Sequence, residues 1–143
     1  MAEKEQDGKL VVRLVTPDRV LLDATADAVE LPSASGYLEA LYGAAPLLAE
    51  LGAGEVRLHG GTSGDQRFFV ARGFVEVLPE RVTILAEKAM KPEAIDRADA
   101  EQDKRRGEAM WAEAGDDGAR YDEANEITRE AEAEIASADG KAL

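Results

Sequence analysis

The side chains that most often perform catalysis are scarce in this sequence and are not spaced to act together. The single histidine, His59, borders a glycine-rich stretch, and one imidazole cannot supply the three or four ligands of a zinc site. The sequence has no cysteine, which excludes thiolate chemistry and disulfides, and no serine lies in the Gly-x-Ser-x-Gly turn of a hydrolase. We therefore expect a protein without a catalytic site, and a small hydrolase is a disfavoured function class.

Two further patterns resemble chemical sites only in part. Gly60, Gly61 and Gly64 are spaced like part of a phosphate-binding loop, but no Lys-Ser or Lys-Thr follows them and no helix is expected to begin there. Asp116 and Asp117 lie between two expected helices, so we interpret them as a turn and a helix cap rather than as a catalytic pair. The sequence thus predicts neither a bound cofactor nor a metal site.

The charge balance excludes a second class of function. The 143 residues carry 30 Asp and Glu against 17 Lys and Arg, for a net charge of -13, whereas binding to a phosphate backbone needs clustered cations. We therefore expect no nucleic-acid partner. The start of the sequence shows no apolar signal region and no run approaches the length of a membrane span, so we expect a soluble cytoplasmic protein.

Short apolar runs fill residues 1–91 and predict the elements that would position a binding surface. Runs rich in Val, Leu and Phe are separated every several residues by Pro, Gly and Asp, which is typical of an antiparallel β-sandwich. Within residues 36–48, GYLEALYGAAPLL, Pro46 keeps Ala45 out of the helical region, so we expect a shaped loop between strands. We predict about ten short strands, among them 10–15, 20–22, 28–31, 38–41, 47–51, 56–58, 68–71, 74–78 and 82–86.

The pattern changes at Pro92, where Ala, Glu and Asp replace Val, Leu and Gly as the common residues. We place a domain boundary there, between residues 1–91 and 92–143. A first helix is expected from Pro92 to about Ala114, and a second from about Arg120 to Ala138. The link Gly115-Asp116-Asp117-Gly118 is short enough to make the two helices an antiparallel hairpin.

The apolar stripes of this expected hairpin are thin, because most of their members are alanines. Small residues let two helices approach closely but bury little area, at about 0.8 kcal/mol per methylene. Two interpretations remain open at this point. The hairpin is either a stable surface element or an element held weakly enough to detach and refold against a partner.

Three stretches together resemble the epsilon subunit of bacterial F-type ATP synthases, a small protein of the rotating central stalk. They are VRLVTPDRVLLDATADAVELPSASG, GYLEALYGAAPLLAELGAGEVRL and FFVARGFVEVLPERVTILAEKA. The second is the most specific, since the family usually has Gly-Glu-Leu-Gly, an apolar pair, and then Pro-Gly-His-Ala-Pro-Leu-Leu. The matching residues in it are Gly36, Leu38, Leu41, Gly43, Ala45, Pro46, Leu47 and Leu48.

The resemblance implies two partner surfaces on the sandwich, with altered chemistry because Tyr37 stands where the family has Glu and Ala44 where it has His. In the family, one loop faces the membrane rotor ring and another lies near the gamma stalk subunit. We assign ring contact to Ser33, Ser35, Gly36 and Tyr37. We assign gamma-subunit contact to Thr16, Pro17, Gly43, Ala44, Ala45 and Pro46. For each residue taken singly, a purely structural role in shaping its turn remains open.

The resemblance also bears on the hairpin, on which some family members bind ATP through Ile/Leu-Asp-x-x-Arg-Ala and a later Arg. The corresponding residues are Ile95, Asp96, Asp99 and Arg106. Asp99 stands where the first Arg belongs and places a negative charge beside the phosphates, so we predict that this motif does not bind ATP. The second helix has few basic residues to meet an acidic loop of the catalytic subunit, so we also predict weak or absent inhibition of ATP hydrolysis through that contact.

The resemblance therefore implies a non-catalytic rotor subunit of a proton- or sodium-driven F-type ATP synthase. It would couple the gamma subunit to the membrane ring, with the hairpin as a possible regulatory contact to the catalytic head. Such a subunit would lie peripherally at the cytoplasmic face of the inner (plasma) membrane and meet the membrane only through the complex. The alternative is a free-standing acidic β-sandwich that binds a ligand or protein. An exposed apolar patch near Tyr37, Tyr42 and Leu47 would favour the first interpretation, and an enclosed pocket the second.

Overall fold

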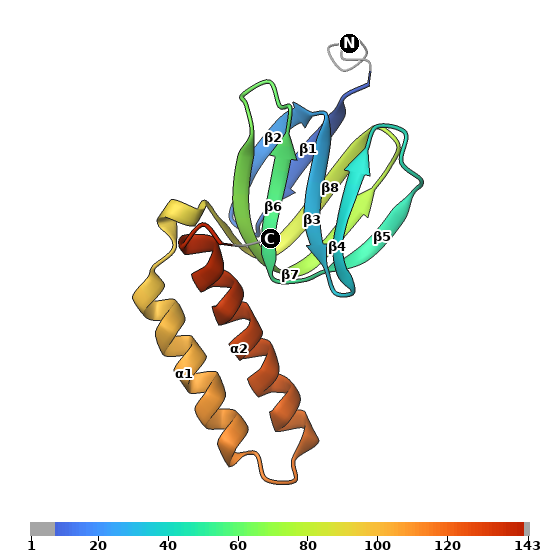
Figure 1. Cartoon of the computed structure of the whole chain (residues 1–143). Helices are drawn as coiled ribbons and strands as arrows, with labels where there is room; N and C mark the ends of the chain where they lie inside the picture. The colour runs from blue at the N-terminus through green and yellow to red at the C-terminus, as the bar shows by residue number, and fades with distance from the viewer. Residues whose placement is uncertain (1–7, 142–143) are drawn as a thin grey trace. The chain divides into compact units, whose positions relative to one another are not determined.

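The computed structural model describes residues 8–141, which form two compact units with the division between Lys91 and Pro92. The first unit is a β-sandwich and the second is a pair of helices (Figure 1). The predicted fold, a β-sandwich followed by a two-helix hairpin, is confirmed. None of the described helices is long and apolar enough to cross a membrane.

Within the described residues the sandwich has eight strands rather than about ten. They are β1 (Leu10–Val15), β2 (Val20–Ala26), β3 (Ala28–Ser33), β4 (Gly36–Leu41), β5 (Leu47–Leu51), β6 (Gly54–His59), β7 (Gln66–Val77) and β8 (Arg81–Met90).

The difference in strand number arises mainly in β7, which the sequence pattern divides at Arg72 and Gly73. Both residues have positive φ angles, 62° and 150°, yet β8 pairs with β7 on both sides of them, from Phe69↔Met90 to Val77↔Val82. The irregular pair is therefore a bend within one strand. A side chain at Gly73 could not be accommodated, because a Cβ there would lie 1.8 Å from the Leu85 carbonyl oxygen.

Because of the bend, the two halves of β7 pair with different strands. Its first half pairs with β6 and its second half pairs with β5, and β3 in turn pairs with β4, β5 and β6. The strand order along the main path is β2-β1-β8-β7-β5-β3-β4. One pair departs from the predicted antiparallel arrangement, since β1 runs parallel to β8.

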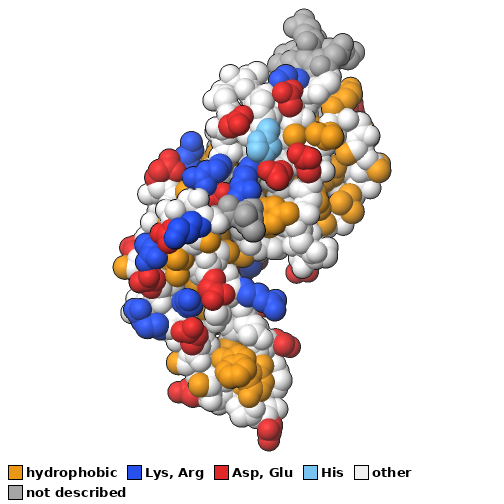
Figure 2. Space-filling model, in the orientation of Figure 1, with side chains coloured by type: hydrophobic (Ala, Val, Ile, Leu, Met, Phe, Trp, Pro, Cys, Tyr) orange, Lys and Arg blue, Asp and Glu red, His pale blue; other side chains and the backbone are white. Residues whose placement is uncertain are grey.

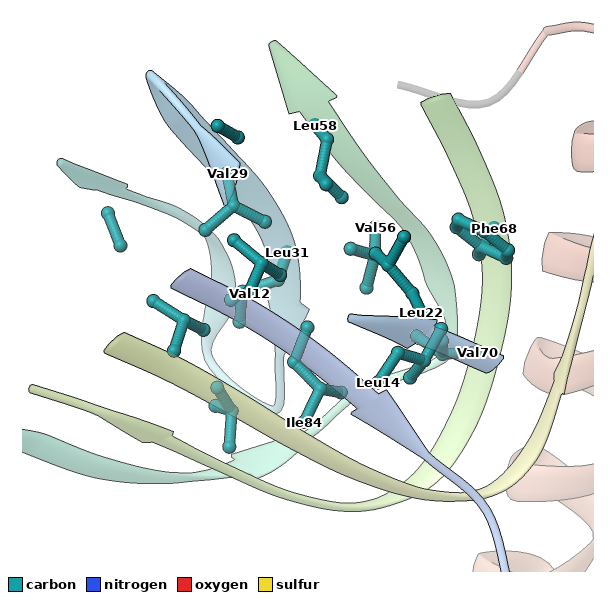
Figure 3. Close-up of a cluster of buried hydrophobic side chains, with 14 of the residues drawn as sticks. Val12, Leu14, Leu22, Val29, Leu31, Val56, Leu58, Phe68, Val70 and Ile84 are labelled. Atoms are coloured by element: carbon teal, nitrogen blue, oxygen red, sulfur yellow. The ribbon is translucent and has the colours of Figure 1, made fainter. Parts of the chain in front are cut away.

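Aliphatic side chains that alternate along the strands fill the space between the layers (Figure 3). Leu10, Val12 and Leu14 on β1 are fully buried, and so is Ile84 on the neighbouring β8. This alternation has the period of two that a half-buried strand requires, and it fixes which residues face outward. Fully burying one such side chain stabilises the fold by about 1.5–3 kcal/mol.

The second unit begins with a 3-10 turn at Pro92–Ala94, followed by α1 (Arg97–Glu113) and α2 (Gly118–Ala138). The first α-helix thus starts later than predicted, because the Asp96 side chain accepts a hydrogen bond from the Asp99 amide and caps it. Asp117 caps α2 as predicted. The helices meet through small side chains, and a Cβ at Gly107 would lie 2.4 Å from Thr128 Oγ1.

Candidate protein-interaction surface

A row of apolar side chains crosses the outside of the sandwich over five neighbouring strands. The strand register places Phe74 of β7 beside Leu85 of β8, Leu85 beside Val15 of β1, and Val15 beside Val20 of β2. Leu48 on β5 lies one pair further along, opposite Glu76. We call these five residues, Val15, Val20, Leu48, Phe74 and Leu85, the outer apolar face.

The outer apolar face is exposed where a core strand would be covered. Leu48 is 72% exposed, Phe74 56% and Leu85 51%, although adjacent residues Val75 and Ile84 are completely buried. Burying one such side chain against a partner contributes about 1.5–3 kcal/mol, before the cost of association is subtracted. A contiguous apolar area of this kind on a folded domain is typical of a protein interface.

Polar groups border the outer apolar face both across and along the strands. Glu50 lies beside Phe74, and the next row carries Glu76 together with an ion pair of 3.8 Å between Arg13 Nε and Asp23 Oδ2. An apolar centre with a polar rim is the usual arrangement of a specific protein–protein contact.

The residues assigned to gamma contact form two groups, which lie near opposite ends of the parallel strands β1 and β8. Thr16 and Pro17 follow β1 in a tight turn, in which the amides of Thr16 and Arg19 donate to each other's carbonyl oxygens. Gly43 lies near the other end, since its amide donates to Pro79 at 2.7 Å in the turn before β8. In the parallel register of β1 and β8, Thr16 is level with Ala86, which is seven residues, or roughly 23 Å, along the strand direction from Pro79.

The loop of the second group is also lined by apolar side chains. Leu41, Tyr42 and Leu47 are each about half exposed and surround Gly43–Pro46 in the sequence. Tyr42 and Leu47 are therefore exposed near this loop, whereas Tyr37, which is also about half exposed, lies at the other end of β4. Sequence reasoning did not single out Phe74 and Leu85, although apolar residues on both faces of two successive strands were a usable signal.

The residues assigned to ring contact lie together at the tip of the β3–β4 hairpin. The Ser33 hydroxyl donates to the Gly36 carbonyl oxygen at 2.6 Å, and Ser33 Oγ lies 3.3 Å from Ser35 Oγ. Gly36 has a φ of 127°, a conformation that other residues rarely adopt. Tyr37 departs from this tip, because its hydroxyl reaches β6 and accepts a hydrogen bond from the Glu55 amide at 2.8 Å.

A different face of the sandwich carries charges of both signs around the single histidine (Figure 2). His59 Nε2 lies 2.7 Å from Glu30 Oε1, and Nδ1 lies 3.9 Å from Asp65 Oδ2. His59 is therefore in contact with acidic neighbours rather than simply solvated. Across the part of the chain that the structure describes, no three His, Cys, Asp or Glu side chains converge as a metal site would require.

The ATP-like motif on the hairpin is occupied by local structural bonds. Asp96 caps α1 through the amide of Asp99, and Arg106 lies 3.5 Å from Asp103 on the same helix. Ile95, which precedes the cap, is half-buried. The structure does not gather these four residues into a cationic cradle.

Arg97, inside the motif, joins the start of α1 to the end of α2. Its guanidinium bonds Asp139 twice, through Nε at 2.8 Å and through a second nitrogen at 3.0 Å, and it also bonds Glu101. The hydrogen bond from Arg97 is the largest influence holding the pKa of the Asp139 carboxyl below its ordinary value. This pair joins residues 42 positions apart and was not identified from the sequence.

Comparisons with known proteins agree with this architecture. Residues 9–92 match the family described as the ATP synthase delta/epsilon chain, beta-sandwich domain. The ATP synthase epsilon chain of Koribacter versatilis is 42% identical over 103 residues, covering 71% of each chain. That of Solibacter usitatus is 40% identical over 135 residues, covering 92% of this chain and 97% of the relative.

A solved structure with a similar fold comes from the Euglena gracilis mitochondrial ATP synthase, described as OSCP/F1/c-ring in rotational state 1. The similarity has a TM-score of 0.76 and covers 91% of this chain and 81% of that one. Sequence identity is 18%, so this comparison supports the fold alone.

Proposed function

Because the chain belongs to the ATP synthase delta/epsilon family and is an epsilon-type, non-catalytic subunit of that complex, we propose that it couples the gamma stalk subunit to the membrane rotor ring. The observation that carries this proposal is the outer apolar face, whose strands β1 and β8 have the two assigned gamma-contact turns near their opposite ends. A subunit of this kind transmits torque through surfaces and makes or breaks no bonds.

The gamma subunit is the proposed occupant of the outer apolar face. Leu48, Phe74 and Leu85 supply the apolar centre, and Thr16 and Gly43 mark the turns near opposite ends of strands β1 and β8. Torque transfer requires a contact that does not slide, and anchoring at two ends of a rigid sheet meets that requirement better than one loop would. The face thus combines affinity from apolar burial with orientation from the turns.

The tip of the β3–β4 hairpin is the proposed contact to the rotor ring. Residues 32–38 carry no charged side chain, and Ser33, Ser35 and Tyr37 offer hydroxyl groups instead. A loop of this chemistry suits a polar but weakly charged partner surface. The subunit would then be peripheral, at the cytoplasmic face of the inner (plasma) membrane, and would meet the membrane only through the complex.

The hairpin is the proposed regulatory element, and we keep both predictions made for it. Its ATP-like motif has Asp99 where a cation belongs, so titration calorimetry on the full chain should detect no micromolar binding of ATP. Its second helix has few basic residues, so deletion of residues 119–143 should leave ATP hydrolysis by the synthase nearly unchanged. Strong activation by the deletion would contradict the second prediction.

A pull-down from native membranes tests the proposal as a whole. Tagged full-length chain should recover the gamma subunit, the catalytic subunits and the rotor ring together. Recovery of none of these under gentle conditions would contradict the rotor role and leave the alternative, a free-standing acidic β-sandwich that binds another ligand or protein.

A further inference from the structure

Tyr37 is held at both ends by groups outside its own hairpin. Its hydroxyl accepts a hydrogen bond from the Glu55 amide at 2.8 Å, and the guanidinium carbon of Arg57 lies 5.9 Å from the centre of its ring. The second distance is within the range of a cation–π contact. The side chain is therefore fixed in position and direction, although 44% of the residue remains exposed.

The sequence around Tyr37 is shaped to receive its hydroxyl. Pro32 lies between Tyr37 and β6. The carbonyl oxygen of Pro32 accepts a hydrogen bond from the Gly52 amide and is therefore already in use as an acceptor. The Tyr37 hydroxyl provides the Glu55 amide with its acceptor. Residue 54 must also be small, because a Cβ on Gly54 would lie 2.5 Å from that hydroxyl oxygen.

A buried ionic group lies directly beneath this contact. The Glu55 side chain has no exposure to solvent, and its two oxygens meet Arg57 Nε at 3.1 Å and Arg67 at 2.9 Å. A buried carboxylate that loses its partners destabilises a protein strongly, so these three side chains keep one arrangement. Arg57 is thereby held against the Tyr37 ring, so the buried Glu55 carboxylate also restricts the position of the exposed Tyr37 side chain.

Tyr37 remains in its hydroxyl form at neutral pH. Burial raises the pKa of the Tyr37 phenol above its ordinary value, against the opposing effect of the hydrogen bond from the Glu55 backbone. The Tyr37 oxygen therefore accepts the hydrogen bond from the Glu55 amide as a neutral phenol and adds no negative charge beside the Glu55 carboxylate.

The tip itself has few long-range connections. Besides the internal bonds of Ser33, one amide–carbonyl bond joins it to β5, from Ala34 to Glu50 at 2.9 Å. We propose that Tyr37, with the Glu55–Arg57–Arg67 group beneath it, is a positioning device that fixes the direction of the 33–37 tip. This role rests on the proposed contact between that tip and the rotor ring.

Amide hydrogen exchange on the full chain tests the positioning directly. Tyr37→Phe removes one hydrogen bond and keeps the ring, so exchange at residues 34–38 and at Glu55 should accelerate roughly fivefold. Gly54→Ala should reproduce this pattern by displacing the hydroxyl. Tyr42→Phe is the matched control, since Tyr42 is similarly exposed and its hydroxyl makes no hydrogen bond within residues 8–141.

The location of the change distinguishes positioning from general stabilisation. The proposal is overturned if Tyr37→Phe leaves residues 34–38 unchanged, or if it accelerates exchange equally in β1 and β2. ATP-driven ion pumping per ATP hydrolysed, followed separately for protons and for sodium ions, is then measured in the assembled synthase carrying Tyr37→Phe. Reduced coupling supports both the positioning and the ring contact. Faster local exchange with unchanged coupling supports the positioning and contradicts the ring contact.

Discussion

The sandwich and the hairpin bury different kinds of side chain. The sandwich encloses Leu, Ile, Val and Phe with almost no exposure, whereas the buried positions of the two helices are chiefly Ala and Gly, with Glu134 and Ser137. Each large aliphatic side chain contributes about 1.5–3 kcal/mol on burial and each added methylene only about 0.8 kcal/mol. The large buried side chains therefore make the sandwich the more stable of the two units. The stability of the hairpin depends more on the interactions at its ends and on the close packing of its two helices.

The largest expected effect comes from cutting a cavity into the sandwich. Ile84→Ala should lower the free energy of unfolding of the sandwich by about 2–5 kcal/mol, because Ile84 is completely buried. Leu85→Ala on the same strand is the control and should cost less than about 1 kcal/mol, because Leu85 faces outward. Urea unfolding followed through the amide resonances of β8 measures both. Equal costs would contradict the assignment of faces.

The hairpin should respond most to a change at its closest approach. Gly107→Ala places a methyl group against Thr128, and we expect a net loss of about 1–3 kcal/mol despite the better helix propensity of alanine. Gly118→Ala is the matched control, because a Cβ there meets nothing within 4 Å, and it should stabilise the helix by up to about 1 kcal/mol. The sole tryptophan, Trp111, packs edge-on against Tyr121, so its fluorescence reports hairpin opening. Stabilisation by both substitutions would show that the helices are not in close contact.

A smaller effect is expected from the cap between the helices. The Asp117 side chain accepts hydrogen bonds from the amides of Ala119 and Arg120, at 3.1 and 3.3 Å. Asp117→Ala should therefore lower the stability of α2 by about 1 kcal/mol, measured by thermal unfolding of the helical signal. Asp116→Ala removes the same charge without the cap and should change little. Equal losses would attribute the effect to charge alone.

The smallest effect concerns the exposed pair at the other end of the hairpin. The pKa of Asp139 is lower in the folded state than in the unfolded state, chiefly through the hydrogen bond from Arg97. The contribution of the Asp139 carboxylate to the folding stability is therefore complete above the ordinary aspartate pKa of about 3.9. It is lost as the pH falls through the lower pKa of the folded state. Trp111 fluorescence during acid titration should show this loss in the native chain and not in Asp139→Asn. An identical titration of the two proteins would contradict the pair.

The sequence pattern predicted the two units and most strand positions because alternation and turn residues are local signals. It divided β7 at Arg72 and Gly73, since a bend within a strand and a turn between strands use the same residues. It could not identify the Tyr37–Glu55 contact or the Arg97–Asp139 pair, which join residues 18 and 42 positions apart. The parallel pairing of β1 with β8 was missed for the same reason.

The central claim is that the outer apolar face of the sandwich, and not the hairpin, attaches this subunit to the stalk. The most direct measurement is quantitative co-purification of the gamma subunit with tagged full-length chain. Two variants are compared: the sandwich variant carries both Leu48→Glu and Phe74→Glu, and the hairpin variant carries Trp111→Ala. All three residues are more than half exposed, so the folds should persist, which circular dichroism verifies. We expect the sandwich variant to lose gamma at least tenfold and the Trp111 variant to retain it. Retention by the sandwich variant together with loss by the Trp111 variant would contradict the account.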